Sequence, residues 1–362
     1  MVELCAASKL PSFRQDPAAW AGALKISRDS INLYLSSDVI DLHIDSFIWT
    51  RIFGYQLQLR HTRGLLAARY CRQVDIPRIR DAQITGATWV ITTNPWRSAK
   101  GRAKAFARNR EKLTAILASA HNDVCIVRTL TEYAAARTAN RHAAFVGIQG
   151  GNALEDPASW ELLNDQTVLR VTLVHLTNSA LGCTSSPLNW GRDRGLSKLG
   201  REFIEYLNYQ KVLVDLAHAS EQTFWDAVTL HDRSLPFIVS HTGMSSVYNH
   251  WRNLTDNQLR AVADTGGVVG VFFHGPFLGS GPFGGRVCGI AKHIVHAVRT
   301  IGAEHVALGS DWDGMIATPL DMPTCLELPM LVQALQNEKL TDDQIQLVLG
   351  GSFLRLLRII RT

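Results

Sequence analysis

The sequence predicts an α/β fold of the (β/α)8 TIM barrel type, with residues 1–38 as an N-terminal helical extension and residues 39–362 as a single barrel domain. Two observations lead to this prediction. Short apolar runs rich in Val and Ile recur eight times, and segments with a helical period separate them. Most of these runs are too continuously apolar for half-exposed antiparallel strands, so they indicate parallel strands buried on both faces. Eight such strands with helical crossovers are expected to close into a barrel.

The predicted strands follow one another with room for a helix between most of them. They span residues 39–45, 84–93, 143–149, 169–175, 211–218, 236–241, 266–273 and 305–311. The clearest helical segments are 109–123, 197–210, 220–231, 255–266 and 288–302. Several begin at Ser, Thr or Asp with an acid or amide close behind, as an N-terminal cap requires. A last helix is expected near residues 340–360, and no linker or internal repeat interrupts the barrel.

Composition excludes several classes of protein. The chain has 362 residues, of which 46% are hydrophobic, and its net charge is only +5. Its basic residues are scattered except over 97–112, which we interpret as a solvated helix face, so no nucleic-acid partner is expected. No secretory signal is evident, and no apolar run approaches the ~20 residues of a membrane span. We therefore expect a soluble, cytoplasmic protein without a membrane partner, whose six widely spaced cysteines are reduced.

The ends of the predicted strands carry polar residues able to bind a metal or move a proton. These are His43, Asp45, Gln149, His175, His218, His241 and Asp311. One histidine at a strand end is usually structural, but this set would converge on the C-terminal rim of one barrel, where barrel enzymes place their reactive groups. His43 and Asp45 share one face of their strand because side chains alternate with a period of two. Imidazole and carboxylate together suit zinc or a similar divalent ion.

These residues lie in longer motifs that resemble a known family. The His43-x-Asp45 pair, "VLRVTLVHLTNSAL", "IVSHTGMSSVYNHWRNLTDNQLRAVADTGGVVGV" and "HVALGSDWDG" occur in order. Together they resemble the membrane (renal) dipeptidases, a branch of the metal-dependent amidohydrolase superfamily. The resemblance runs from about residue 39 to 358.

The resemblance implies a two-zinc site, with manganese or cobalt as other possible metals, that hydrolyses a small dipeptide or dipeptide-like acid. His43 and Asp45 would hold one ion, His218 and His241 the other, and a carboxylate on the third predicted strand would bridge them. His175 would polarise the scissile carbonyl, Arg252 would bind the terminal carboxylate of the substrate, and Asp311 would shuttle the proton. Zinc lowers the pKa of a bound water to roughly 7 and so provides a hydroxide nucleophile. A homodimer is expected by analogy with the family.

The sequence departs from the family pattern in "FVGIQGGNAL". Gln149 stands where the bridging glutamate belongs, and Asn152 where a histidine usually stands. The repulsion between two divalent cations at such a separation amounts to several kcal/mol even at an effective dielectric near 20, and glutamine removes one anionic bridge between them. A full two-zinc site is therefore expected to be weakened.

Three hypotheses stay open at this point. The Gln149 amide could still coordinate an ion in a weakly loaded or one-metal hydrolase. One metal could instead lie among His43, Asp45, His218 and Asp311 and serve different chemistry, such as a tailoring step on a peptide-derived metabolite. The barrel could also be a catalytically silent binding protein. An engineered glutamate-to-glutamine change is a fourth explanation, against which Asn152 argues.

The loops after the first two predicted strands are expected to shape the pocket. Trp49, Phe53, Tyr55 and Trp96 in these loops could stack on an apolar substrate group, or could equally anchor the loops to the barrel. Because His250, His274 and His305 do not end a predicted strand, we expect them to be structural.

Overall fold

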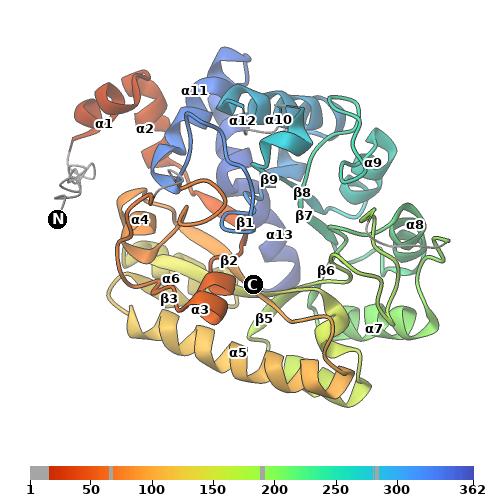
Figure 1. Cartoon of the computed structure of the whole chain (residues 1–362). Helices are drawn as coiled ribbons and strands as arrows, with labels where there is room; N and C mark the ends of the chain where they lie inside the picture. Colours follow the sequence, from red (N-terminus) through yellow and green to blue (C-terminus); the bar gives the residue numbers. More distant parts are fainter. Residues whose placement is uncertain (1–15, 65–67, 188–191, 280, 282–284) are drawn as a thin grey trace.

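The computed structural model describes residues 16–64, 68–187, 192–279, 281 and 285–362. Eight parallel strands form a closed barrel, which confirms the predicted fold class (Figure 1). They are β1 (Ile40–Ile44), β2 (Gly86–Thr92), β4 (His142–Gln149), β5 (Val168–Thr172), β6 (Leu213–Asp215), β7 (Ile238–Thr242), β8 (Val268–Val271) and β9 (Val306–Leu308). The pairing of β2 with both β1 and β4 closes the ring.

A ninth strand, β3 (Val124–Ile126), was not predicted. It pairs with the first residues of β4, and the same edge of β4 pairs with β5 from Val146 onward. β3 therefore widens the sheet at one end without entering the ring of eight.

Helices surround the barrel (Figure 1). They are α1 (Pro17–Leu24), α2 (Arg28–Ser36), α3 (Phe47–Phe53), α4 (Ile76–Asp81), α5 (Ala99–Ser119), α6 (Leu130–Thr138), α7 (Lys198–Tyr209), α8 (Glu221–Leu230), α9 (Asp256–Ala263), α10 (Val287–Ile301), α11 (Pro329–Asn337), α12 (Asp342–Gln346) and α13 (Ser352–Ile360). Side-chain caps start many of them; at α9, for example, Thr255 and Gln258 form a capping box.

The last helix closes the barrel at the end where the strands begin. Apolar side chains of α13, among them Phe353 and Leu357, are buried with Ile40, Phe145 and Leu213 near the starts of their strands. The rings of Phe145 and Phe353 meet edge to face at 5.3 Å. With this end filled, the opposite end of the barrel is the one left to bind a ligand.

The helices α1 and α2 fall in the predicted N-terminal extension, whose first fifteen residues lie outside the described part of the chain. α2 lies beside α11, where the Ser30 hydroxyl donates to the Gln336 side chain at 2.6 Å. The Tyr34 hydroxyl donates to the Ala82 carbonyl at 2.7 Å. The division into an extension and a barrel domain stays a prediction.

Two further expectations concern the chain as a whole. Within the described ranges, no helix is both long and apolar enough to cross a bilayer. The thiols of the described cysteines, Cys71, Cys125, Cys183, Cys288 and Cys325, are free, and Cys5 lies outside the described residues.

Candidate metal centre

The predicted site residues meet at the C-terminal rim of the barrel, although not all of them end a strand. His43 and His241 lie within β1 and β7, and Gln149 is the last residue of β4. The prediction that His175, His218 and Asp311 end strands was wrong: they lie three residues beyond β5, β6 and β9. His218 and Asp311 have left-handed backbones, with φ of 65° and 64°. Such strain in residues other than glycine concentrates at functional sites.

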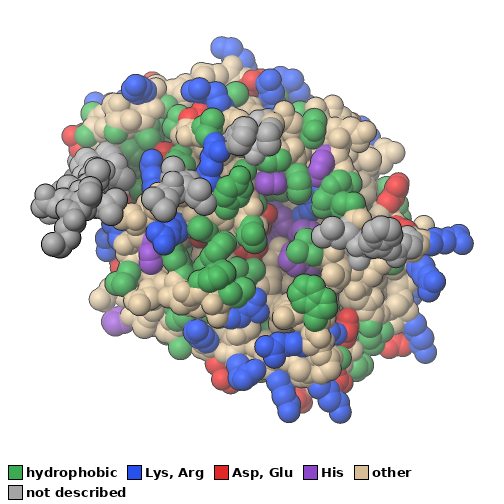
Figure 2. Space-filling model, in the orientation of Figure 1, with side chains coloured by type: hydrophobic (Ala, Val, Ile, Leu, Met, Phe, Trp, Pro, Cys, Tyr) green, Lys and Arg blue, Asp and Glu red, His purple; other side chains and the backbone are tan. Residues whose placement is uncertain are grey.

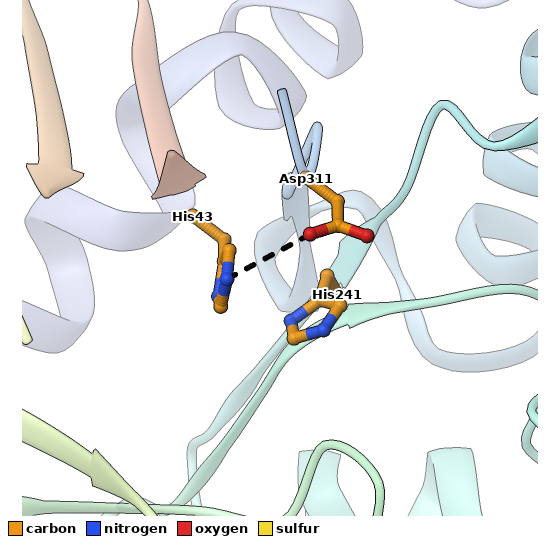
Figure 3. A group of neighbouring side chains, drawn as sticks. All are labelled: His43, His241 and Asp311. Carbon is orange, nitrogen blue, oxygen red and sulfur yellow. Dashed lines mark ion pairs between the residues drawn. The ribbon is translucent and has the colours of Figure 1, made fainter. Parts of the chain in front are cut away.

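Three side chains from distant parts of the sequence could hold one cation (Figure 3). Ligand atoms of His43, His241 and Asp311 all lie within 4.8 Å of one another. The Nε2 of His43 lies 3.8 Å from Oδ1 of Asp311. His218 adjoins this group, because its Nε2 lies 2.9 Å from Nε2 of His241. The arrangement thus offers two to three imidazoles and one carboxylate to a single ion, a donor set that suits zinc.

The hydrogen bonds of His241 leave one of its ring nitrogens available to a metal. The Ser240 hydroxyl donates to Oδ2 of Asp215 at 2.6 Å, so its oxygen accepts from Nδ1 of His241 at 2.9 Å. His241 then keeps its lone pair on Nε2, facing His218. Burial lowers the pKa of His218 and of His241 well below the usual range. Both rings are therefore neutral, as metal ligation requires.

The Gln149 side chain occupies the other half of the site. Its neighbours assign the orientation of the amide: with the nitrogen toward Asp45 it donates to both carboxylate oxygens at 3.0 Å, and its oxygen then accepts from Nε2 of His43 and of His175, both at 3.3 Å. The amide thus engages Asp45 through hydrogen bonds that a carboxylate in this position could not donate. The donor set on the His241 side fits an ion, whereas the neutral Gln149 amide cannot supply an anionic bridge to a second one.

A buried ion pair that the sequence analysis missed lies beneath His43. Arg170 in β5 donates to Oδ2 of Asp215 in β6 at 2.7 Å, and its second terminal nitrogen donates to Nδ1 of His43 at 2.7 Å. A guanidinium can only donate, so Nδ1 of His43 accepts this bond and Nε2 carries the ring proton; to hold an ion at Nε2, the ring must move its proton to Nδ1, which lies 3.4 Å from the Ser240 hydroxyl. The signal was present in the sequence, because each is an isolated charge within an otherwise apolar predicted strand.

The two residues predicted to be catalytic have strongly shifted acidities. Burial lowers the pKa of His175 to about 4, so its ring is neutral near pH 7. Burial, and next the negative charge of Asp45, raise the pKa of Asp311 well above its usual value. A neutral imidazole and a carboxyl group that can hold a proton are a common combination in acid–base catalysis.

Arg252 lies behind the rim of the site. It is 4% exposed, and its guanidinium donates to the His241 carbonyl at 2.7 Å. Burial lowers its pKa to about 10, which leaves it cationic at neutral pH. It lines a small cavity of about 140 Å³ that shares His218 and Trp251 with the main one. Its predicted contact with a substrate carboxylate stays a prediction.

The main cavity opens directly above the metal centre. It measures about 520 Å³, and Asp45, Gln149, His175, His218 and Asp311 are among the residues that line it. Figure 2 shows histidine side chains in a hollow among hydrophobic ones. A cavity of this size, with a few convergent polar groups in apolar surroundings, is typical of a small-molecule site.

Comparisons with known proteins agree with this geometry. An uncharacterised protein from the pqqA 5′ region of Klebsiella pneumoniae is 35% identical over 167 residues, which cover 45% of this chain and 60% of that protein. An uncharacterised dipeptidase of Schizosaccharomyces pombe is 31% identical over 229 residues, covering 62% of this chain and 54% of that protein. The chain thus spans little more than half of these curated relatives.

Solved structures share the fold at low identity. A metallopeptidase from Rhodobacter sphaeroides, bound to a phosphinate mimic of the dipeptide L-Ala-D-Ala, superposes with a TM-score of 0.77 at 21% identity, over 90% of this chain and 99% of its own. The probable dipeptidase PvdM from Pseudomonas aeruginosa gives 0.80 at 17% identity, over 92% and 98%. The family model for membrane dipeptidases matches residues 29–362. This confirms the resemblance seen in the sequence, and the chain belongs to the membrane dipeptidase family, peptidase family M19.

Proposed function

We propose that this protein is a metal-dependent hydrolase that cleaves a dipeptide or dipeptide-like acid and works with one divalent ion, zinc in the first place. One observation carries the proposal. The Gln149 amide hydrogen-bonds both oxygens of Asp45, while His43, His241 and Asp311 keep ligand atoms within 4.8 Å of one another. The first contact argues against a bridged pair of ions, and the second supports a single one.

Each residue around the ion has a separate role in the proposed reaction. When bound, a divalent ion supplies a water of lowered pKa and polarises the scissile carbonyl. The Asp311 carboxylate takes a proton from the attacking water and passes it to the leaving nitrogen. His175 lies at the cavity floor with Nε2 3.3 Å from the Gln149 amide oxygen, and from there it donates to the developing oxyanion. Arg252 attracts the terminal carboxylate from the adjoining cavity.

The proposal is tested by assaying a dipeptide panel, including dipeptides with a C-terminal D-residue, with Zn²⁺, Mn²⁺ or Co²⁺ supplied. We expect turnover by the wild-type protein and its loss in Asp311→Asn, because the amide can neither exchange the proton nor offer the ion an anionic ligand. The Asp264→Asn variant, on the exterior after α9, serves as the matched control and should keep full activity. Wild-type protein that cleaves nothing on the panel would rule out dipeptide hydrolysis.

A tailoring reaction on a peptide-derived metabolite is the second candidate. The same Gln149–Asp45 contact favours it, because it reshapes the half of the site where the family pattern places a bridging glutamate. Binding of dipeptides without turnover, in protein that holds one equivalent of zinc, would favour this candidate. A homodimer and a cytoplasmic location stay predictions.

A further inference from the structure

Exposed apolar side chains ring the mouth of the main cavity. Phe53, Met315 and Ile52 are 70%, 68% and 58% exposed, and Leu176 and Trp251 also line the cavity with more than a third of their surface exposed. Single exposed apolar residues are ordinary on protein surfaces, but a contiguous group around a cavity marks a binding surface. Polar residues line the cavity below these side chains, so the molecule expected to cover them is a ligand bound in the cavity.

One side of the ring forms a rigid surface that we call the α3 wall, made of Trp49, Ile52 and Phe53 from α3 and Met315 from the loop after β9. The Trp49 indole nitrogen donates to the Asp313 carbonyl at 2.6 Å, which fixes the indole against the loop after β9. The Phe53 ring stacks on Trp49, with centroids 5.2 Å apart and planes 26° apart. A preorganised apolar wall loses little conformational entropy when a ligand binds.

Another part of the cavity lining leads toward positive charge. Trp251 packs edge to face on Phe277 at 5.5 Å, and Arg252 lies next along the chain in the adjoining cavity. Among the described residues that line the main cavity there is no Lys or Arg. A substrate carboxylate is therefore attracted toward Arg252, and the other end of the substrate meets the α3 wall, which offers only apolar contact.

We propose that the α3 wall selects substrates with a large apolar group on the amino side of the scissile amide, either a bulky side chain or an N-acyl chain. This inference rests on the proposed function, because it takes the orientation of the substrate from Arg252. The cavity of about 520 Å³ has room for such a group beyond the amide and its carboxylate.

The experiment uses N-acylglycines from acetyl to octanoyl, which keep the amide and the carboxylate constant. Calorimetry measures their dissociation constants with metal-free wild-type protein, in which binding occurs without turnover. We expect the dissociation constant to fall with each added methylene, by up to about fourfold for a fully buried one. In the metal-free Phe53→Ser/Met315→Ser protein, the total fall in dissociation constant from acetyl to octanoyl should be about tenfold smaller.

A matched control replaces exposed apolar residues that line no described cavity. Leu59→Ser with Leu320→Ser, at 54% and 59% exposure, should leave the chain-length dependence unchanged. Dipeptides compared by their amino-terminal residue, Gly against Phe, then separate a side chain from an acyl chain as the preferred group. Dissociation constants independent of acyl length would overturn the inference, as would an equal loss in the control variant. Because the experiment measures binding and not hydrolysis, its result can be interpreted even if the protein does not hydrolyse dipeptides.

Discussion

At the scale of single residues, Gln149 determines how the polar groups on its side of the site are paired by hydrogen bonds. A glutamate in its place would set a second carboxylate about where the amide nitrogen now lies, 3.0 Å from both oxygens of Asp45. Two carboxylates so close repel each other unless a cation lies between them or they share a proton. The amide removes that need, because it donates to Asp45 and accepts from His43 and His175. The buried polar groups on this side of the site are therefore paired without a metal ion.

The Gln149→Glu variant tests this account. We expect zinc content to rise from one to two equivalents per chain, because the carboxylate restores an anionic bridge beside Asp45. In chelator the same variant should melt at a lower temperature than the wild type, since the two carboxylates then repel each other in a buried site. Elemental analysis and calorimetry measure the two effects.

The control for this variant is Asn257→Asp, which adds the same charge on the exposed surface of α9. It should change neither the zinc content nor the melting temperature in chelator by much. One equivalent of zinc in Gln149→Glu would mean that the rest of the pocket no longer accepts a second ion, and the argument from charge would fail.

At the scale of elements, the sequence predicted the barrel strands because their Val and Ile runs are long and flanked by helical segments. β3 was missed because three residues carry too little periodicity to separate a strand from a loop. The left-handed turns at His218 and Asp311 could not be predicted either, since only glycine and asparagine commonly signal that conformation. The sequence predicted that side chains converge at the rim, because parallel strands all end on the same side of a barrel. It did not predict the Arg170–Asp215 pair, which depends on tertiary contacts between neighbouring strands.

The start of β4 gives a prediction about pH. His142 is buried there: its Nδ1 donates to the Ile84 carbonyl at 2.8 Å, and its Nε2 accepts from the Trp89 indole at 3.1 Å. Burial lowers the pKa of His142 from an ordinary value of 6.5 to about 4. Between pH 6.5 and about 4, the unfolded chain therefore binds a proton on this histidine that the folded chain does not bind. The free energy of unfolding falls as the pH drops through that window. The full effect amounts to about 3 kcal/mol.

Urea unfolding of wild type and His142→Gln at a series of pH values measures this contribution. The variant should be less stable at pH 7, because glutamine cannot keep both hydrogen bonds, but its stability should fall less steeply between pH 6.5 and 4. Parallel curves for the two proteins would show that His142 is not the group responsible.

At the scale of the whole molecule, the candidate metal centre joins the beginning, middle and end of the chain. His43, His241 and Asp311 come from β1, β7 and the loop after β9, and the continuous run of paired strands β1-β9-β8-β7 holds them in place. α13 fills the opposite end, so the rim is supported from below by a packed core. A ligand that binds these three residues together binds only the folded barrel, and it must stabilise the molecule as a whole.

Zinc added to metal-free protein should therefore raise the melting temperature in a saturable way. At a free zinc concentration 100 times the dissociation constant, the gain in unfolding free energy is about 2.7 kcal/mol. For a chain of this length that corresponds to a shift of about 3–4 °C. Differential scanning calorimetry should detect the shift in the wild type and in His121→Ala. His121 is exposed and lies far along the sequence from His43, His241 and Asp311. The shift should disappear in His241→Ala, because the ring whose Nε2 is free for a metal is then gone. A shift that persists in His241→Ala would place the zinc elsewhere, and the single-ion centre at the rim would have to be abandoned.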